Sequence, residues 1–185
     1  MASPRLTPTP QPAASQAAPA AQYSLSPRGR TFIVQREGGY VDHFYNDNAG
    51  HCTFGAGTLV RMAGCTPDEL RRHLTPAEIE QPLLDGIQRA ERAVRRNVTV
   101  NLAQSQFDAL VSLVYNAGPG AHGTQDGAQP MFQEVNRRGA DAAARRLLTT
   151  AIHSRHVDNA GHVTMQVNRG LVNRRQLELA LYQGR

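Results

Sequence analysis

The stretch EGGYVDHFYNDNAGHCTFGAG, residues 37–57, places three carboxylates, a threonine and several glycines within a short span. It mixes β-branched and aromatic residues with Asn-Asp-Asn and Gly, a composition typical of short antiparallel strands joined by tight turns. The segment before it, residues 30–36 (RTFIVQR), predicts a short helix that ends at glycine, so that Glu37 lies on its last turn. We therefore expect a helix end and a β-hairpin to form two walls of a cleft.

The carboxylates of this stretch suit the hydrolysis of a glycosidic bond. That reaction needs a protonated acid on the leaving oxygen and a second carboxylate that activates water or stabilises the sugar cation. Glu37 is the candidate acid, because apolar neighbours favour the uncharged form of a carboxyl group. Asp47, in the hairpin turn, is the candidate ionised partner, and Thr53 has a hydroxyl that can hold a water molecule. Spacing alone leaves a simpler interpretation open, in which Glu37 caps a helix and Asp47 fills a turn.

Other chemistries have weaker support in the sequence. Asp42 is an alternative to Asp47, but the NDNAG turn is the better platform for a fixed carboxylate. The pair His51-Cys52 lacks the helix N-terminal setting of a catalytic cysteine. Three further histidines follow no metal-ligand spacing, so we expect neither a metal nor a cofactor; they are His153, His156 and His162.

The composition indicates one globular domain with a tail. The chain has 185 residues, of which 40% are hydrophobic, and its formal net charge is +5, with arginine as its only basic residue besides histidine. A basic surface suits a polyanionic partner such as nucleic acid, an acidic cell wall or a membrane face, although it also serves simple solubility. An aromatic content of 5% and the lack of a recognition motif argue against nucleic acid.

No targeting or membrane segment is visible. The sequence has no run of about 18 apolar residues, the length that a membrane span requires. The start, MASPRLTPTP, lacks the charged and then apolar pattern of a secretory signal. We therefore expect synthesis in the cytoplasm, with another factor needed if the protein acts outside it.

The first thirty residues predict a disordered tail or linker. Residues 1–30 are rich in Pro, Ala, Gln and Ser and contain too little apolar surface to offset their ordering entropy. Order is expected from about Thr31, so residues 31–185 form the catalytic domain.

Helix signals dominate the remainder of the chain. Thr66 and Thr75 each precede a proline and stand three residues before a glutamate, which is the capping-box pattern. The second of these helices should extend over 76–96, because apolar residues recur at helical spacing; they are Ile79, Leu83, Ile87, Ala90 and Val94. Its arginines should lie on a solvated face; they are Arg89, Arg92, Arg95 and Arg96. The segment 103–118 is apolar nearly all round, so it predicts a buried central helix that ends at the following Gly-Pro-Gly.

The C-terminal third predicts more helices around that centre. Two short helices are expected over 131–139 and 140–152, then a polar connection over 153–168, and a closing helix over 169–183. The whole is mainly α with one small hairpin.

Three stretches resemble the phage-type lysozymes, glycoside hydrolase family 24. The first is Glu37-Gly38 with Tyr45-x-Asp47-x-x-Gly50-x-x-Thr53-x-Gly55-x-Gly57, the second is Gln106 to Ser112 with Asn116-Ala117-Gly118, and the third is Gly170 to Arg175. They occur in the family's order. The resemblance implies a mainly α (α+β), two-lobed lysozyme-like fold with a small β-hairpin lobe and a helical C-terminal lobe around a long central helix.

The resemblance also implies an activity and roles for residues. It implies a muramidase that cuts the β-1,4 bond between N-acetylmuramic acid and N-acetylglucosamine in peptidoglycan, without a cofactor. Carried over by position, Glu37 is the general acid, Asp47 positions or activates water, and Thr53 assists on that face. Tyr45 and Asn116 correspond to substrate-binding or supporting positions, although Asn116 also suits a helix C-cap. Arg174 matches an arginine that supports the acid.

Cys52 and Cys65 are not general features of that family. They stand thirteen positions apart around the predicted hairpin, so they either pair in an oxidising compartment or are unrelated thiols. If they pair, the disulfide braces the lobe that carries Asp47.

The expected setting is a phage endolysin. Such a protein, most simply a monomer, is made in the host cytoplasm and acts on peptidoglycan in the periplasm. Three alternatives remain open: an antibacterial effector delivered by secretion machinery and matched by an immunity protein, a non-catalytic wall-binding module, and a basic nucleic-acid binder.

Overall fold

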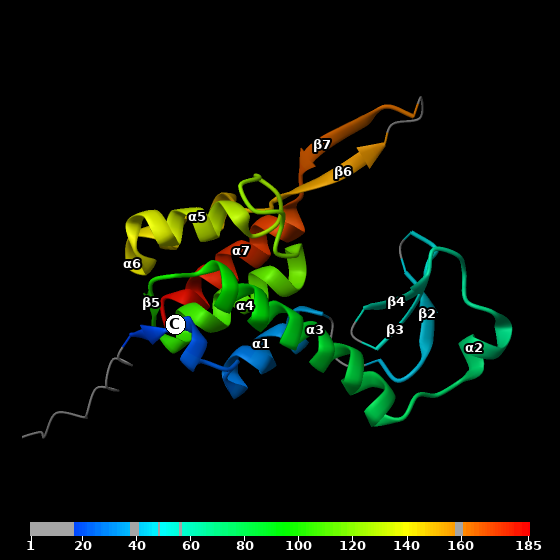
Figure 1. Ribbon diagram of the computed structural model, residues 1–185. Helices are drawn as coiled ribbons and strands as arrows, with labels where there is room; N and C mark the ends of the chain where they lie inside the picture. Colours follow the sequence, from blue (N-terminus) through cyan, green and yellow to red (C-terminus); the bar gives the residue numbers. More distant parts are fainter. Residues whose placement is uncertain (1–16, 38–40, 48, 56, 158–160) are drawn as a thin grey trace, which may run out of the picture.

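Two lobes joined by one long helix make up the structure, a computed structural model that describes residues 17–37, 41–47, 49–55, 57–157 and 161–185 (Figure 1). The smaller lobe contains β2 (Phe44–Asn46), β3 (Cys52–Phe54), β4 (Thr58–Arg61) and α2 (Pro67–Arg71). The joining helix is α3 (Pro76–Asn97). The larger lobe contains β1 (Ala18–Pro19), η1 (Ala20–Gln22), α1 (Pro27–Arg36), β5 (Asn101–Leu102), α4 (Gln104–Ala117), α5 (Gln129–Arg138), α6 (Ala140–Ala143), η2 (Ala144–Thr149), β6 (His153–Val157), β7 (Val163–Val167) and α7 (Arg169–Tyr182).

The small lobe is a three-stranded antiparallel meander in the order β2-β3-β4. Its own small core contains Phe44, Cys52, Leu74 and Ile79. The turns of this lobe depend on glycine: Gly57 has a φ of 85°, a left-handed conformation that other residues seldom adopt. The predicted short strands and tight turns of this segment are therefore confirmed.

Both capping boxes predicted from the sequence are present. Thr66 and Thr75 each accept a hydrogen bond from the backbone N–H of the glutamate three residues later, and that glutamate bonds back to the threonine N–H. Helix α3 then runs for 22 residues, and its buried stripe contains the residues expected from the helical period; these are Ile79, Leu83, Ile87, Ala90 and Val94. The predicted helix over 76–96 is confirmed.

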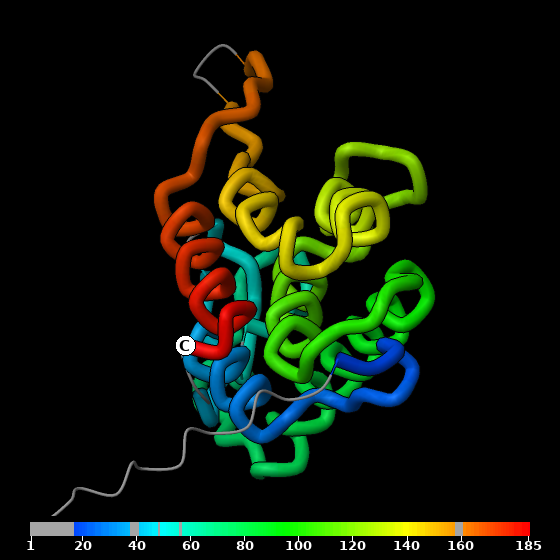
Figure 2. The backbone as a smooth tube through the Cα atoms, turned by 90° about the vertical axis from the view of Figure 1, so that its left-hand side faces the viewer, coloured from blue at the N-terminus to red at the C-terminus, as the bar shows by residue number. Residues whose placement is uncertain are grey.

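The core of the large lobe surrounds α4. Residues from Gln106 to Val114 are all buried, which confirms the prediction of a central helix without a solvated face. Helices α1, α3 and α7 pack against it, and Figure 2 shows α4 enclosed among them. The backbone leaves the helix at Gly118, whose φ is 73°. The mainly α, two-lobed fold class is thus confirmed.

The prediction of a tail through residue 30 is wrong for residues 17–30, while residues 1–16 lie outside the described chain. Strand β1 pairs with β5, and Ala20 is buried in the core. Helix α1 starts at Pro27 because Ser26 caps it, accepting from the Gly29 N–H at 3.1 Å. The backbone N–H and the hydroxyl of Ser26 both donate to Asp108 on α4, at 3.0 and 2.5 Å. Contacts with distant residues supply the apolar burial that this segment lacks in its own composition.

The polar connection predicted over 153–168 is also wrong. Its ends form β6 and β7, which pair antiparallel with Val157 opposite Val163, and this hairpin projects from the large lobe (Figure 1). One face of the hairpin is apolar, with Val163 and Met165 exposed by 51% and 64%. The period-two alternation of Val163-Thr164-Met165-Gln166-Val167 is the strand signal that reveals it.

Helix predictions in the C-terminal third hold with one difference. Helices α5 and α7 occupy the expected segments, whereas the segment 140–152 forms the short α6 followed by the 3-10 helix η2. Among the described helices, none combines the length and the apolar composition that crossing a lipid bilayer requires.

Candidate active site in the groove between the lobes

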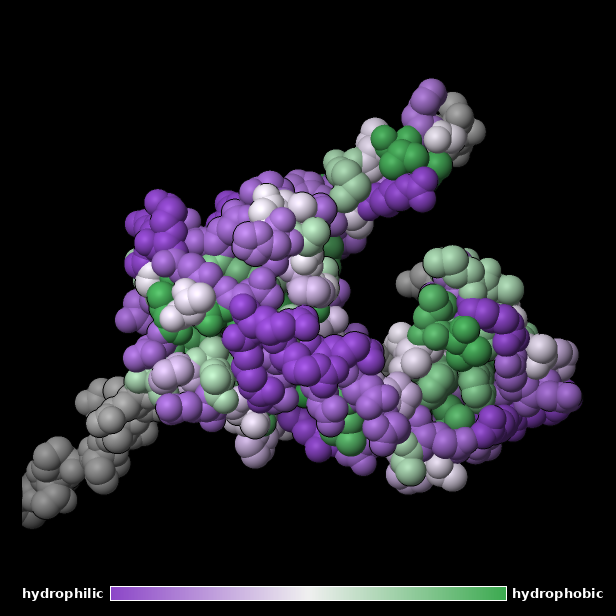
Figure 3. Space-filling view, in the orientation of Figure 1, coloured by the Kyte–Doolittle hydropathy of each residue, from purple (hydrophilic) through white to green (hydrophobic). Residues whose placement is uncertain are grey.

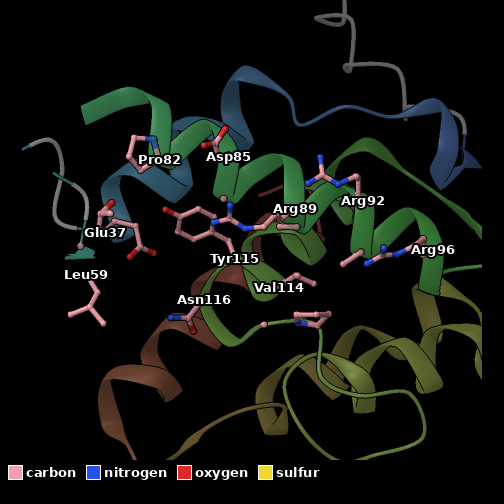
Figure 4. Close-up of a pocket in the computed structure, with 17 residues that line it drawn as sticks. Glu37, Leu59, Pro82, Asp85, Arg89, Arg92, Arg96, Val114, Tyr115 and Asn116 are labelled. Carbon is pink, nitrogen blue, oxygen red and sulfur yellow. The ribbon is translucent and has the colours of Figure 1, made fainter. Parts of the chain in front are cut away.

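A groove of about 840 Å³ lies where the two lobes meet. Its walls come from the end of α1, the start of β4, one side of α3 and the end of α4, with Glu37, Leu59, Arg89 and Asn116 among the lining residues (Figure 4). The space-filling view shows the molecule hollowed between the small lobe and the large lobe (Figure 3). The predicted cleft between a helix end and a β-hairpin is therefore present.

Glu37 lies at the point where the lobes approach each other. Its backbone N–H closes α1 by donating to the Ile33 carbonyl at 3.0 Å, and its side chain is 19% exposed. Oε1 accepts a hydrogen bond from Arg174 Nη1 at 2.8 Å. Oε2 faces the small lobe, since a Cβ added to Gly57 would lie 3.9 Å from it. Gly38, the second residue of the motif, lies outside the described residues.

A buried charge network on α7 supports this carboxylate. Arg174 Nε lies 3.2 Å from Glu178 Oε1, and Arg175 Nη1 donates to Glu178 Oε2 at 2.5 Å. Glu178 also accepts from the Ser112 hydroxyl on α4 at 2.8 Å. Arg175 and Glu178 are completely buried, so each charge depends on the others. Arg175 and Ser112 lie in motif stretches but had no predicted role, and Glu178 was not singled out from the sequence. The spacing of both arginines before Glu178 on one helix was the available signal.

Asn116 connects this network to the groove. It lines the groove wall, and its Oδ1 accepts from Arg175 Nη2 at 2.7 Å. The helix C-cap is Gly118 and not Asn116, so the alternative interpretation of this asparagine is wrong. Arg174, Asn116 and Glu37 are thus brought together from three parts of the chain.

Asp47 lies in the turn between β2 and β3 and is bound by that turn. Its Oδ1 accepts from the backbone N–H groups of Ala49 and His51, at 2.8 and 2.9 Å. These hydrogen bonds, that of His51 above all, lower the pKa of Asp47 below its ordinary value. The carboxylate is therefore ionised at neutral pH, as a group that orients water would have to be.

Thr53 and Tyr45 face each other across the β2–β3 ladder. Thr53 is buried, and its hydroxyl donates to the His51 carbonyl at 3.3 Å, which ties it to the turn of Asp47. Burial raises the pKa of Tyr45, and the negative charges of Asp47 and Glu37 raise it further. The phenol thus lies within the electric field of both carboxylates.

The candidate residues form two groups in the described chain. Glu37 and Asn116 line the groove, with Arg174 behind them, whereas Asp47, Thr53 and Tyr45 belong to the small lobe and are not part of the groove lining.

A disulfide joins Cys52 and Cys65 in the small lobe. Cys52 is completely buried in the core of that lobe, one residue before Thr53. The backbone N–H of Cys65 donates to the Asn46 side chain at 2.7 Å. The disulfide and this hydrogen bond together hold the segment after β4 against β3 and β2. Both sulfurs are therefore unavailable as nucleophiles or as metal ligands.

Potential metal ligands gather at one place in the described residues, namely Cys52, Cys65 and Glu69. Two of these three are the disulfide sulfurs, so the cluster is not a metal site. The histidines considered from the sequence (His153, His156 and His162) form no such cluster within the same described ranges.

The arginines of α3 have positions that the helical pattern predicted only in part. Arg89, Arg92 and Arg96 are exposed, as expected for a solvated face, and they also line the groove, which was not expected. Arg95 instead donates to the Tyr23 carbonyl at 2.6 Å and holds the N-terminal segment. The sequence pattern gave the helix but not the side that faces the groove, because that side depends on how α4 and the small lobe pack.

Comparison with known proteins agrees with this geometry. Residues 35–178 match the phage lysozyme family. The endolysin of Bacillus phage PZA is 33% identical over 112 residues, 60% of this chain and 38% of that protein, so the chain spans less than half of that relative. The endolysin of Salmonella phage P22 is 28% identical over 124 residues, 67% of this chain and 81% of that protein.

A solved structure shares the fold as well. The endolysin from Escherichia coli O157:H7 phage FAHEc1 superposes with a TM-score of 0.68 and 27% identity, covering 87% of this chain and 94% of that one. The matched segment contains Glu37, Asp47, Thr53 and Arg174, and it extends from the end of α1 to the buried Glu178. This chain belongs to the phage lysozyme family.

Proposed function

We propose that this protein is a muramidase that hydrolyses the β-1,4 bond between N-acetylmuramic acid and N-acetylglucosamine in peptidoglycan. The observation that carries the proposal is the position of Glu37, which faces the groove between the lobes while a buried ion network holds it. The similarity to phage endolysins supports the same activity.

Glu37 acts as the general acid in this proposal. Arg174 binds Oε1, which leaves Oε2 free to carry the proton and to deliver it to the leaving glycosidic oxygen. Because Arg174 is itself held by Glu178, the carboxyl group keeps one orientation at the groove.

Asp47 is the second carboxylate in this proposal. Hydrogen bonds from the backbone of its turn keep it ionised, so it can orient or activate water, or stabilise positive charge on the sugar. Thr53 fixes the turn from the buried side and is the candidate for holding that water. Tyr45, on β2, lies within the electric field of both carboxylates and is the candidate for contacting the substrate beside them.

The proposed setting is cell lysis by a phage endolysin. The enzyme would be made in the host cytoplasm and would act on peptidoglycan in the periplasm, as a monomer. The disulfide fits a site of action outside the reducing cytoplasm.

The test compares the wild type with Glu37→Gln on purified peptidoglycan. We expect the wild type to clear the suspension and release new reducing ends without free amines. Glu37→Gln keeps the shape of the side chain but cannot donate the proton, so its rate should fall by about 10² to 10⁴.

Asp47→Asn and Asp42→Asn complete the comparison. Asp47→Asn should also lose most activity, whereas Asp42→Asn should stay near the wild-type rate. The Asp42 carboxylate bonds to His43 and His73 at the surface, whereas the turn that follows β2 holds Asp47 through backbone N–H groups. Full activity of a folded Glu37→Gln protein, or release of amines in place of reducing ends, would refute the proposal.

A further inference from the structure

Three arginines form a row along the groove wall beyond Glu37. Arg89, Arg92 and Arg96 are exposed, lie on one side of α3 and all contribute to the groove lining. Figure 4 shows them succeeding one another along the helix, with Glu37 and Leu59 toward the opposite end of the groove in this view. The active-site assignment above gives them no role.

These arginines combine two features in the described chain: they line the groove, and no carboxylate pairs with them. Several surface arginines elsewhere do pair with carboxylates, as Arg61 does with Glu69, Arg71 with Asp68, and Arg137 with Glu134. Within the described residues, Arg89, Arg92 and Arg96 make no ion pair or side-chain hydrogen bond. Their guanidinium groups are therefore available to an anion that enters the groove.

The acids of the same groove do not satisfy this charge. Glu37 is bound by Arg174. Asp85 accepts from the Gln81 amide at 2.8 Å, and no ion pair joins it to Arg89 four residues later. The part of the groove along α3 is thus electropositive, and a guanidinium suits a carboxylate because its planar fork can donate two parallel hydrogen bonds.

We propose that Arg89, Arg92 and Arg96 bind the free carboxylates of the peptide that peptidoglycan carries on its muramic acid. This inference rests on the proposed function and assigns a second recognition element to the same groove. The intact glycan backbone of the substrate carries no charge, so the anions closest to the scissile bond are those of the attached peptide.

The dimensions agree with this occupant. Arg89 and Arg96 are seven residues apart, which corresponds to about 10 Å along a helix. A peptide of four residues in extended conformation spans about 13 Å. With the glycan at Glu37, a peptide of this length running along α3 brings successive carboxylates to successive arginines.

The experiment measures binding separately from cleavage. Every protein carries Glu37→Gln, so that strands remain intact, and fluorescently labelled soluble glycan strands bearing tetrapeptides are titrated at low salt. The test variant adds Arg89→Gln, Arg92→Gln and Arg96→Gln. The matched control adds Arg71→Gln, Arg137→Gln and Arg138→Gln, which remove the same charge away from the groove. Thermal unfolding verifies that each protein is folded.

A second substrate identifies the group that is bound. The same strands are treated so that their peptide carboxylates become amides. We expect the groove variant to bind the untreated strands about tenfold more weakly, the order of three exposed ion pairs, and the control to change by less than about twofold. On amidated strands the groove variant and its parent should bind equally.

Several results would overturn the inference. These are equal losses in the groove and control variants, an undiminished effect of the three arginines on amidated strands, or no binding of untreated strands by the parent. The proposed function fails differently, through an absence of new reducing ends with the wild-type protein, so the two failures can be told apart.

Discussion

At the scale of single residues, the chemistry depends on charges held in place by other charges. Glu37 and Arg174 are 137 residues apart in sequence and 2.8 Å apart in space. Behind them, Glu178 forms ion pairs with both Arg174 and Arg175, and the side chains of Arg175 and Glu178 are completely buried. A buried ion pair of this kind adds little net stability, but removing one member leaves an uncompensated charge, which is costly.

Glu178→Gln should therefore destabilise the fold strongly. It leaves Arg174 and Arg175 without their shared counter-charge, and we expect the free energy of unfolding in urea to fall by about 3–5 kcal/mol. Glu80→Gln removes an exposed partner of Arg30 and should cost less than about 1 kcal/mol. Equal effects of the two substitutions would show that the buried network does not hold α7 in place.

At the scale of elements, helix α2 shows how one side chain joins a helix to a sheet. Glu69 closes the capping box with Thr66 and also binds Arg61 of β4 at 2.5 and 2.8 Å. The hydrogen bond from Arg61, followed by that from the Thr66 N–H, lowers the pKa of Glu69 from its ordinary value of 4.5 to about 2.

The stability of the small lobe should therefore depend on acid pH. The folded state lowers the pKa of Glu69, so its contribution is complete above about pH 5 and disappears as the pH falls from about 4.5 toward 2. We expect Glu69→Gln to reduce the free energy of unfolding near neutral pH, and this difference from wild type to vanish near pH 2. Urea unfolding of both proteins between these limits measures it.

Asp68→Asn is the control on the same helix. The Asp68 side chain is 94% exposed and, within the described residues, pairs with Arg71 alone, so its removal should change stability much less at neutral pH. A difference between Glu69→Gln and wild type that persists unchanged down to pH 2 would contradict the assigned role of Glu69.

At the scale of the whole molecule, the net positive charge and the arginines of the groove should both attract an anionic polymer. The chain carries a formal net charge of +5, and unpaired arginines line the groove wall. Long-range attraction of this kind brings an anionic polymer to the surface and weakens as salt shortens the Debye length.

Association with intact peptidoglycan should accordingly depend on salt. Raising the ionic strength from about 0.01 M to about 1 M shortens the Debye length from about 30 Å to about 3 Å, so the fraction of Glu37→Gln protein that sediments with peptidoglycan should fall. Peptidoglycan with amidated carboxylates serves as the comparison and should show a smaller change. Sedimentation that is independent of salt would exclude a charge-driven first encounter.

Local signals in the amino-acid sequence account for much of the fold. The Thr-Pro-x-Glu pattern set the starts of α2 and α3, the helical period of Ile79 to Val94 gave the buried side of α3, and the Gly-rich segment predicted the small sheet. The sequence could predict these features because helix caps, hydrophobic periodicity and tight turns depend on residues a few positions apart. Residue type and spacing made Glu37, Asp47 and Thr53 candidates, but left a simpler interpretation open, and the resemblance to the phage-type lysozymes implied their roles.

The sequence could not predict features that depend on contacts between distant residues. Residues 17–30 are ordered because Asp108 binds Ser26 and Phe107 packs against Tyr23. The Pro/Ala-rich composition of this segment does not predict these contacts. The groove position of Arg89, Arg92 and Arg96 follows from the packing of α3 between the two lobes. The Glu37–Arg174–Glu178 network needs α1 and α7 side by side, and only long-range packing supplies the burial that makes its charges interdependent.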